Sequence, residues 1–160
     1  MNKALRLLVL IQLFPLTAWA EFREYKVAGD SMSPVLRSGD RVTVETEPKE
    51  PLRRGELVEV AFRGPSGPMV KRLAAVPGDN VAFRDNAVWV NEERVREIDP
   101  GRWRSTITQM ERFGGKVPEG QCLILGDNPL NSKDSGKLGL ISIDHLKGRI
   151  VRVTRERSGE

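Results

Sequence analysis

The chain has 160 residues, of which 39% are hydrophobic and 30% charged, and its formal net charge is +4. This length and balance predict a folded protein with a small core and exclude a disordered, collagen-like or repetitive chain. Because basic and acidic residues are interspersed and form no basic stripe beyond the first twenty residues, we expect no nucleic-acid partner.

Residues 1–20 have the features of an export segment. Lys3 and Arg6 give a basic start, and the apolar stretch after them ends in Ala-Trp-Ala at 18–20, a small-x-small cleavage pattern. As a helix this stretch would span about 21 Å, whereas the hydrocarbon core of a bilayer is about 30 Å thick. Length favours a cleaved signal peptide, and a retained membrane anchor stays open because bilayers thin and basic side chains snorkel. Both readings export the rest of the chain.

From Phe22 onward, short apolar runs alternate with Gly, Pro and Asp turns, which is typical of β-strands. Asp85-Asn86 predicts a hairpin turn, and one short helical turn is expected at 143–147. So many short strands favour an all-β, barrel-like fold preceded by an N-terminal hydrophobic helix, with 21–160 as a single domain. The strands are expected at 25–28, 41–45, 56–62, 69–76, 81–83, 88–90, 103–110, 121–125 and 149–154.

Cysteine, histidine and metal chemistry have little support in the sequence. Cys122 is the only cysteine and sits in an apolar run, so it is expected in the core. His145 is the only histidine and is expected at the surface or as a helix cap. With no Cys/His cluster, we expect no metal and no cofactor. Carboxylates and lysines remain as candidate bases.

A glycine-led turn carries Ser31 after the strand expected at 25–28. Gly29 allows close backbone approach, and the N–H groups next to the serine are available to a developing oxyanion. Taken alone, this pattern fits a purely structural turn better than a catalytic one.

A lysine lies inside the apolar run 69–76. If Lys71 faces inward, desolvation disfavours its ammonium form and lowers its pKa, which makes the amine a base toward a serine hydroxyl. Strand alternation then puts Arg72 on the opposite face. The alternative is an outward-facing lysine on a strand edge, and the motif alone favours that alternative.

A polar loop at 126–139 is richer in Asn, Asp and Ser than a connection needs, and its side chains are candidate partners for a buried lysine and arginine. Together with the two earlier blocks it resembles the signal peptidase I family of Ser/Lys serine peptidases, from about residue 27 to residue 153. The matching motifs are Ser31-Met32-x-Pro34, Val70-Lys71-Arg72 through Pro77-Gly78-Asp79, and Gly126-Asp127-Asn128 through Asn131-Ser132-x-Asp134-Ser135.

The resemblance implies a role for each matched residue. Ser31 would attack the scissile carbonyl, and Lys71, buried and neutral, would act as its general base. Ser132 would hydrogen-bond the lysine nitrogen and orient it. The Ser31 N–H would form part of the oxyanion hole, with only a backbone donor available from Gly29. Met32 would pack near the base and keep it dry.

The same resemblance implies a structural ion pair between Arg72 and Asp134. The family usually has an arginine directly after its Asp-Ser pair, whereas this chain has Gly136 followed by Lys137. The usual pair is therefore expected to be lost or taken over by Lys137, which cannot form a two-point fork. The segment 80–121 is short, which implies that the large extra domain of some bacterial members is absent or vestigial. In this the chain resembles the compact conjugative-transfer and mitochondrial inner-membrane peptidases.

By this resemblance the partners are preprotein signal peptides and a membrane lipid surface, and the substrates carry small residues one and three positions before the cut. The protein would sit in the cytoplasmic membrane with its catalytic domain on the exported side, or be soluble in the periplasm if residues 1–20 are removed. Self-cleavage after Ala20 is one hypothesis. One competing reading is a LexA-type self-cleaving repressor, which needs a DNA-binding domain before Ser31, where this chain has an export-like segment. The other is a non-catalytic relative in pilus or conjugative assembly, which the intact Ser31 and Lys71 argue against and Gly136 keeps open.

Overall fold

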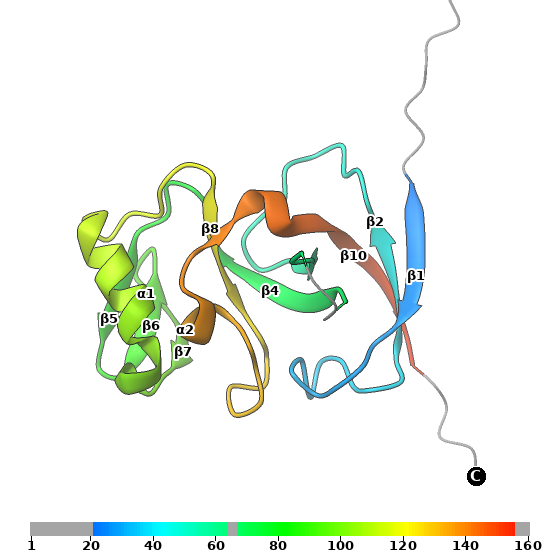
Figure 1. Ribbon diagram of the computed structural model, residues 1–160, viewed down its shortest axis with the longest axis horizontal. Coiled ribbons are helices and arrows are strands. Elements are labelled where there is room, and N and C mark those ends of the chain that lie inside the picture. Colours follow the sequence, from blue (N-terminus) through cyan, green and yellow to red (C-terminus); the bar gives the residue numbers. More distant parts are fainter. Residues whose placement is uncertain (1–20, 64–66, 156–160) are drawn as a thin grey trace, which may run out of the picture.

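The structure, a computed structural model, describes residues 21–63 and 67–155. They form a seven-stranded antiparallel sheet and a smaller three-stranded sheet covered by one helix (Figure 1). The large sheet contains β1 (Phe22–Lys26), β2 (Arg41–Glu45), β3 (Leu57–Val60), β4 (Met69–Ala75), β8 (Gln121–Leu125), β9 (Ile141–Ser142) and β10 (Leu146–Thr154). The small sheet contains β5 (Val81–Arg84), β6 (Ala87–Val90) and β7 (Glu93–Glu97), and the helices are α1 (Pro100–Arg112), α2 (Ser135–Leu138) and the 3-10 turn η1 (Ile143–His145).

The large sheet has the strand order β1-β2-β10-β3-β4-β8-β9, and all of its pairs are antiparallel. The long strand β10 pairs with β2 through its second half and with β3 through its first, with a register shift in each pairing. Such irregularities bend a strand and increase its twist. The expected all-β class is confirmed. The expected N-terminal helix falls on residues 1–20, outside the described residues.

The molecule is elongated, and Figure 1 shows the small sheet and α1 at one end and β1, β2 and the end of β10 at the other. Strands β4 and β8 lie between these ends. One apolar cluster joins β4 and β8 to the small sheet and α1, with Leu123 and Val88 fully buried in it. A second cluster packs Met32 and Leu36 against Val70 of β4.

The expected strand at 103–110 is wrong, because these residues belong to α1. Asp99 caps the helix by accepting a hydrogen bond from the Gly101 N–H at 2.9 Å, and Pro100 stands in the first turn, where its missing N–H costs nothing. The buried residues are Trp103, Thr106 and Met110, a helical spacing that turns one face toward the core.

Other local predictions fared better. Asp85 and Asn86 both have φ of 52°, as the expected hairpin turn between β5 and β6 requires. The short helical turn expected at 143–147 is η1. Strand β7 and helix α2 were not anticipated. Within the described ranges 21–63 and 67–155, no helix is both long and apolar enough to cross a bilayer.

Candidate active site

Ser31 stands in the turn that leaves β1. Gly29 has φ of +80°, a value that favours glycine, and it opens the turn. Immediately after the serine, Met32 is 2% exposed and its carbonyl accepts a hydrogen bond from the Leu36 N–H at 2.9 Å. The buried methionine anchors the turn on the core, in the same apolar cluster as Val70, while Ser31 itself stays half-buried.

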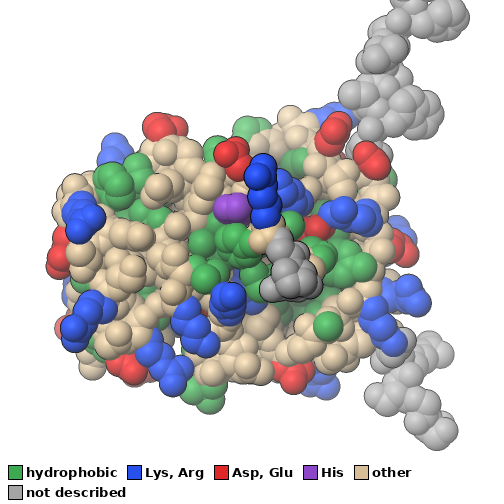
Figure 2. All heavy atoms as spheres, viewed as in Figure 1, with side chains coloured by type: hydrophobic (Ala, Val, Ile, Leu, Met, Phe, Trp, Pro, Cys, Tyr) green, Lys and Arg blue, Asp and Glu red, His purple; other side chains and the backbone are tan. Residues whose placement is uncertain are grey.

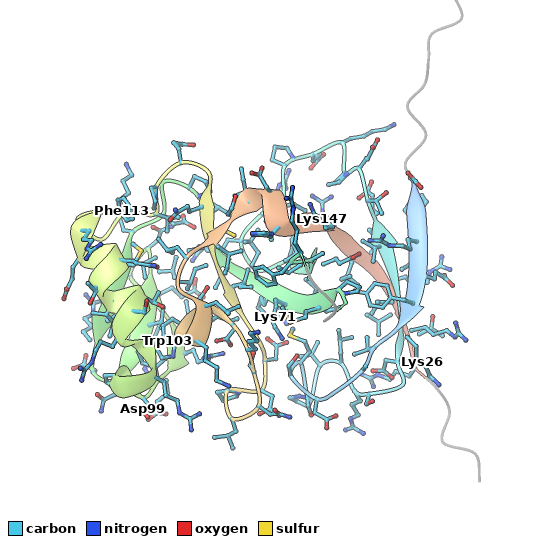
Figure 3. All side chains as sticks on the ribbon, viewed as in Figure 1. Lys26, Lys71, Asp99, Trp103, Phe113 and Lys147 are labelled. Carbon is cyan, nitrogen blue, oxygen red and sulfur yellow. The ribbon has the colours of Figure 1, made fainter. Side chains whose placement is uncertain are left out.

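Lys71 projects from β4 toward this turn. Its Nζ lies 2.6 Å from the Ser31 Oγ, within hydrogen-bonding distance, although the two residues are 40 positions apart. The lysine is only 1% exposed, one of the largest fully buried side chains described. Figure 3 shows Lys71 in the interior, between β4 and the loop that follows β8. The sequence-based expectation of an inward-facing lysine agrees with this geometry.

The surroundings of Lys71 favour its neutral form. Burial is the largest influence and lowers the pKa of the amine from its ordinary value of 10.5, because a low-dielectric interior disfavours the ammonium ion. The carboxylates of Asp134 and Asp127 oppose this effect, and the guanidinium of Arg96 adds to it. The net lowering makes the amine available as a proton acceptor beside the serine hydroxyl.

The loop after β8 is hydrogen-bonded to the turn that carries Ser31. The Asn128 N–H donates to the Ser31 carbonyl oxygen at 3.0 Å, and the Asn128 side-chain amide donates to the Asp30 carbonyl at 3.1 Å. At Gly126 the two segments approach so closely that a Cβ would lie 2.5 Å from the Ser31 carbonyl oxygen and would also collide with the Ser132 hydroxyl. A glycine is therefore required at this position.

Ser132 is buried beside Gly126, at 5% exposure. Its hydroxyl makes no hydrogen bond of normal geometry to any residue that the structure describes. The expected hydrogen bond to the Lys71 nitrogen is therefore not formed in this structure, although the hydroxyl lies close enough to Asp134 to help lower the pKa of that carboxyl.

The expected ion pair between Arg72 and Asp134 is wrong. Arg72 instead forms a two-point pair with Asp127, Nε to Oδ1 at 2.9 Å and Nη2 to Oδ2 at 2.6 Å, and it also donates to the Gly55 carbonyl. The physical reason is strand alternation: Arg72 points away from the face of β4 that carries Lys71, and Asp127 rather than Asp134 lies on that side.

Asp134 pairs with Arg96 of β7, with Nη1 and Oδ2 separated by 3.1 Å. The same carboxylate accepts the Gly126 N–H at 2.9 Å and caps α2 through the Gly136 N–H at 3.1 Å. Burial, the largest influence, raises the pKa of Asp134, but Arg96 and these hydrogen bonds outweigh it and lower the pKa. The cation that pairs with Asp134 is therefore Arg96 and not Lys137, which is exposed.

Arg96, Asp127 and Asn128 are the residues near the site whose roles the sequence reasoning missed. Asp127 and Asn128 belong to the motif that was recognised, so their position was anticipated even though their contacts were not. Arg96 carried no signal, because four of the five residues of β7 are charged and the strand was not recognised from the sequence.

A pocket of about 510 Å³ opens beside Ser31. Its wall is largely apolar, and Figure 2 shows apolar side chains gathered at the centre of the face in front of β4. The lining includes Tyr25, Val27, Ala28, Met69 and Val70. The pocket is thus suited to hold an extended, apolar segment against the serine.

Other reactive groups lie elsewhere. The His145 ring packs on Phe62, with 4.7 Å between ring centres, and its Nδ1 lies 3.1 Å from the Ala61 carbonyl oxygen. Cys122 is buried in the core, and burial raises the pKa of its thiol to about 12. In the part of the chain that the structure describes, no group of three or more His, Cys, Asp or Glu residues could hold a metal ion.

Similarity to known proteins identifies the family of this chain. The family model described as signal peptidase, peptidase S26 matches residues 1–154. The chain is 32% identical over 142 residues to signal peptidase I of Bacillus caldolyticus, covering 81% of this chain and 77% of that protein. It is 34% identical over 136 residues to signal peptidase I T of Bacillus subtilis, covering 79% and 70%. A crystal structure of a signal peptidase I from Enterococcus faecalis matches with a TM-score of 0.46 at 22% identity, over 66% of this chain and 100% of that one.

Proposed function

Because the chain belongs to the signal peptidase family, peptidase S26, and is thus a serine peptidase of the kind that removes signal peptides, we propose that it cuts exported preproteins with a Ser31/Lys71 catalytic pair. The observation that carries this proposal is the 2.6 Å separation between the Lys71 nitrogen and the Ser31 oxygen. An amine that is 1% exposed and carries a lowered pKa is the base that such a pair needs.

In the proposed reaction, the Ser31 hydroxyl gives its proton to the neutral Lys71 amine as its oxygen attacks the scissile carbonyl. The resulting oxyanion accepts hydrogen bonds from the Ser31 N–H and from a backbone donor at Gly29. The Lys71 ammonium then protonates the leaving amine, which departs with the mature protein. Water next attacks the acyl ester, gives its proton to Lys71, and releases the signal peptide as the serine regains its proton.

Ser132 remains the proposed orienting group of the amine. Its buried hydroxyl is next to Gly126 and has a hydrogen bond to offer, since none of normal geometry is formed within 21–63 and 67–155. A buried hydroxyl without a partner is costly, so a bond to the lysine ammonium that forms during the reaction would be favourable at that stage.

The proposed substrates carry small residues one and three positions before the cut. The largely apolar pocket beside Ser31 supports the binding of an apolar segment next to the serine. The proposed partners are accordingly preprotein signal peptides, presented at a membrane lipid surface. We place the protein at the cytoplasmic membrane with its catalytic part on the exported side, or in the periplasm if residues 1–20 are removed.

The decisive experiment compares purified wild type with Ser31→Ala on a preprotein that has an Ala-x-Ala site. Ser33→Ala is the matched control, because it removes a hydroxyl from the same turn without touching Lys71. We expect the wild type and Ser33→Ala to cleave and Ser31→Ala to be inactive. Equal cleavage by the wild type and Ser31→Ala would refute the role of Ser31 as nucleophile. No cleavage by the wild type would favour a non-catalytic relative acting in pilus or conjugative assembly.

A further inference from the structure

Arg96 is an arginine from the small sheet that reaches the neighbourhood of the catalytic pair. It lies on β7, its side chain is 14% exposed, and its Nη1 donates both to the Gly126 carbonyl at 2.8 Å and to Asp134 Oδ2 at 3.1 Å. A long cationic side chain is seldom buried to this extent unless specific partners bind its charge.

The position of Arg96 is fixed from its other side by Trp103. The guanidinium carbon lies 5.4 Å from the centre of the Trp103 ring, an arrangement that attracts a cation to an aromatic face. Trp103 is 3% exposed on α1, and Figure 3 shows it on the side of α1 that faces α2. It fits there because residue 136 is glycine: a Cβ on Gly136 would lie 2.7 Å from the indole nitrogen.

Arg96 and Asp134 bind the two backbone polar groups of Gly126, its carbonyl and its N–H. Asp134 accepts the Gly126 N–H at 2.9 Å, and Arg96 binds the Gly126 carbonyl. Two residues further along, Asn128 donates to the Ser31 carbonyl at 3.0 Å. The ion pair therefore braces the segment against which the serine turn rests.

The charged groups that act on the pKa of Lys71 are the carboxylates of Asp134 and Asp127 and the guanidinium of Arg96. Asp127 is matched by Arg72, with 2.6 Å between Nη2 and Oδ2, and Asp134 is matched by Arg96. Of the two carboxylates, Asp134 raises the pKa of Lys71 more, and Arg96 acts in the opposite direction. Without Arg96, the Asp134 charge would be uncompensated and would stabilise the Lys71 ammonium.

We propose that Arg96 is a positioning residue for the Ser31/Lys71 pair, which braces Gly126 behind the serine and neutralises Asp134 beside the lysine. The inference rests on the proposed function and extends it: the small sheet and α1 supply a part of the catalytic arrangement rather than only covering the core. The role is one of support, since Arg96 contacts neither Ser31 nor the bond to be cut.

The test is the pH dependence of preprotein cleavage by Arg96→Met, which keeps an unbranched apolar stem and removes the charged guanidinium. We expect kcat to fall about tenfold or more with KM little changed, because the loss lies in the chemical step. We also expect the acidic limb of the kcat/KM profile to move up by roughly half to one pH unit, because a stabilised Lys71 ammonium loses its proton only at a higher pH. Arg96→Lys should restore the wild-type limb.

Arg84→Met is the matched control. Arg84 also lies in the small sheet, pairs with Glu92 at 2.7 Å and stands 4.3 Å over the ring of Trp89, but its contacts are at the surface. It should leave the rate and the pH profile unchanged. An Arg96→Met protein with the wild-type rate and limb, or an Arg96→Lys limb displaced as far as that of Arg96→Met, would overturn the inference.

If Arg96→Met does not fold, Asp134→Asn decides. It removes the carboxylate that raises the pKa of Lys71 and leaves Arg96 in place, so the acidic limb should move to lower pH, and an unchanged limb would overturn the inference. The proposed function is judged separately by Ser31→Ala. If Ser31→Ala is inactive and Arg96→Met behaves like the wild type, the proposed role of Arg96 is refuted while the proposed function is supported.

Discussion

The Lys71 amine lies 2.6 Å from the Ser31 hydroxyl, although three strands of one sheet separate the strands that carry them. Ser31 follows the edge strand β1, Lys71 lies on β4, and β2, β10 and β3 are between them. The sheet must curve strongly to close this distance, and the closure buries the amine to 1% exposure. The burial that would make Lys71 a base therefore lowers the stability of the fold.

Lys71→Met should make the protein more stable at neutral pH while abolishing cleavage. A buried amine is expensive, and its removal should stabilise the fold by about 1–3 kcal/mol. Arg96 and Arg72 still pair with Asp134 and Asp127, so no carboxylate is left alone. Urea unfolding followed by fluorescence, with Lys147→Met as an exposed control, checks the prediction.

The stability difference should also depend on pH in a defined direction. The folded pKa of Lys71 is lowered from 10.5, so between the folded and unfolded values the unfolded chain binds more protons, and the wild type gains stability as pH rises. The advantage of Lys71→Met should therefore shrink as the pH rises from the lowered folded pKa toward 10.5. A variant that is less stable than the wild type at neutral pH, or an advantage that grows with pH, would contradict the account.

The ion-pair assignment near the site can be tested with double-mutant cycles on the free energy of unfolding. Arg72→Met combined with Asp127→Asn should show a coupling energy of about 1 kcal/mol, because two hydrogen bonds join these partly buried side chains. Arg72→Met combined with Asp134→Asn should show less than half of that. A larger coupling to Asp134 would restore the pair that the sequence suggested.

Gly126→Ala should lower both stability and activity. Its Cβ would meet the Ser31 carbonyl oxygen at 2.5 Å, a backbone atom that cannot move without shifting the nucleophile. We expect a loss of about 2 kcal/mol in unfolding free energy and a fall of more than about tenfold in kcat. Gly101→Ala, in the exposed first turn of α1, is the control. Its Cβ would meet the exposed Asp99 carboxylate at 3.2 Å, a side chain that can move aside, so stability should change little and activity not at all. Normal activity in Gly126→Ala would show that this contact does not position Ser31.

Ser31 and Lys71 were brought together by the resemblance of three motifs, in order, to the signal peptidase I family, because each motif alone fits a structural role better. The helix α1 was misread because Trp103, Ile107 and their polar neighbours fit a strand period as well as a helical one. Only the cap made by Asp99, with Pro100 in the first turn, separates the two readings, and that signal was passed over.

The contacts around the pair could not be predicted in the same way. Asp127 and Asp134 are both carboxylates in one polar loop, and which of them meets Arg72 depends on how the loop turns over the face of β4. Arg96 acts from a strand that is mostly charged and exposed, a pattern with no apolar alternation to predict its place.

The central claim is that the Lys71 amine is neutral at working pH, and its direct measurement is an NMR titration of the lysine side-chain nitrogens in isotope-labelled protein. Lys71→Arg, which should be inactive because a guanidinium does not lose its proton, identifies the Lys71 signal by its disappearance. The account predicts that this signal titrates well below the ordinary value of 10.5, in the pH range where the acidic limb of cleavage activity lies. A Lys71 signal that titrates at or above 10.5 would contradict it.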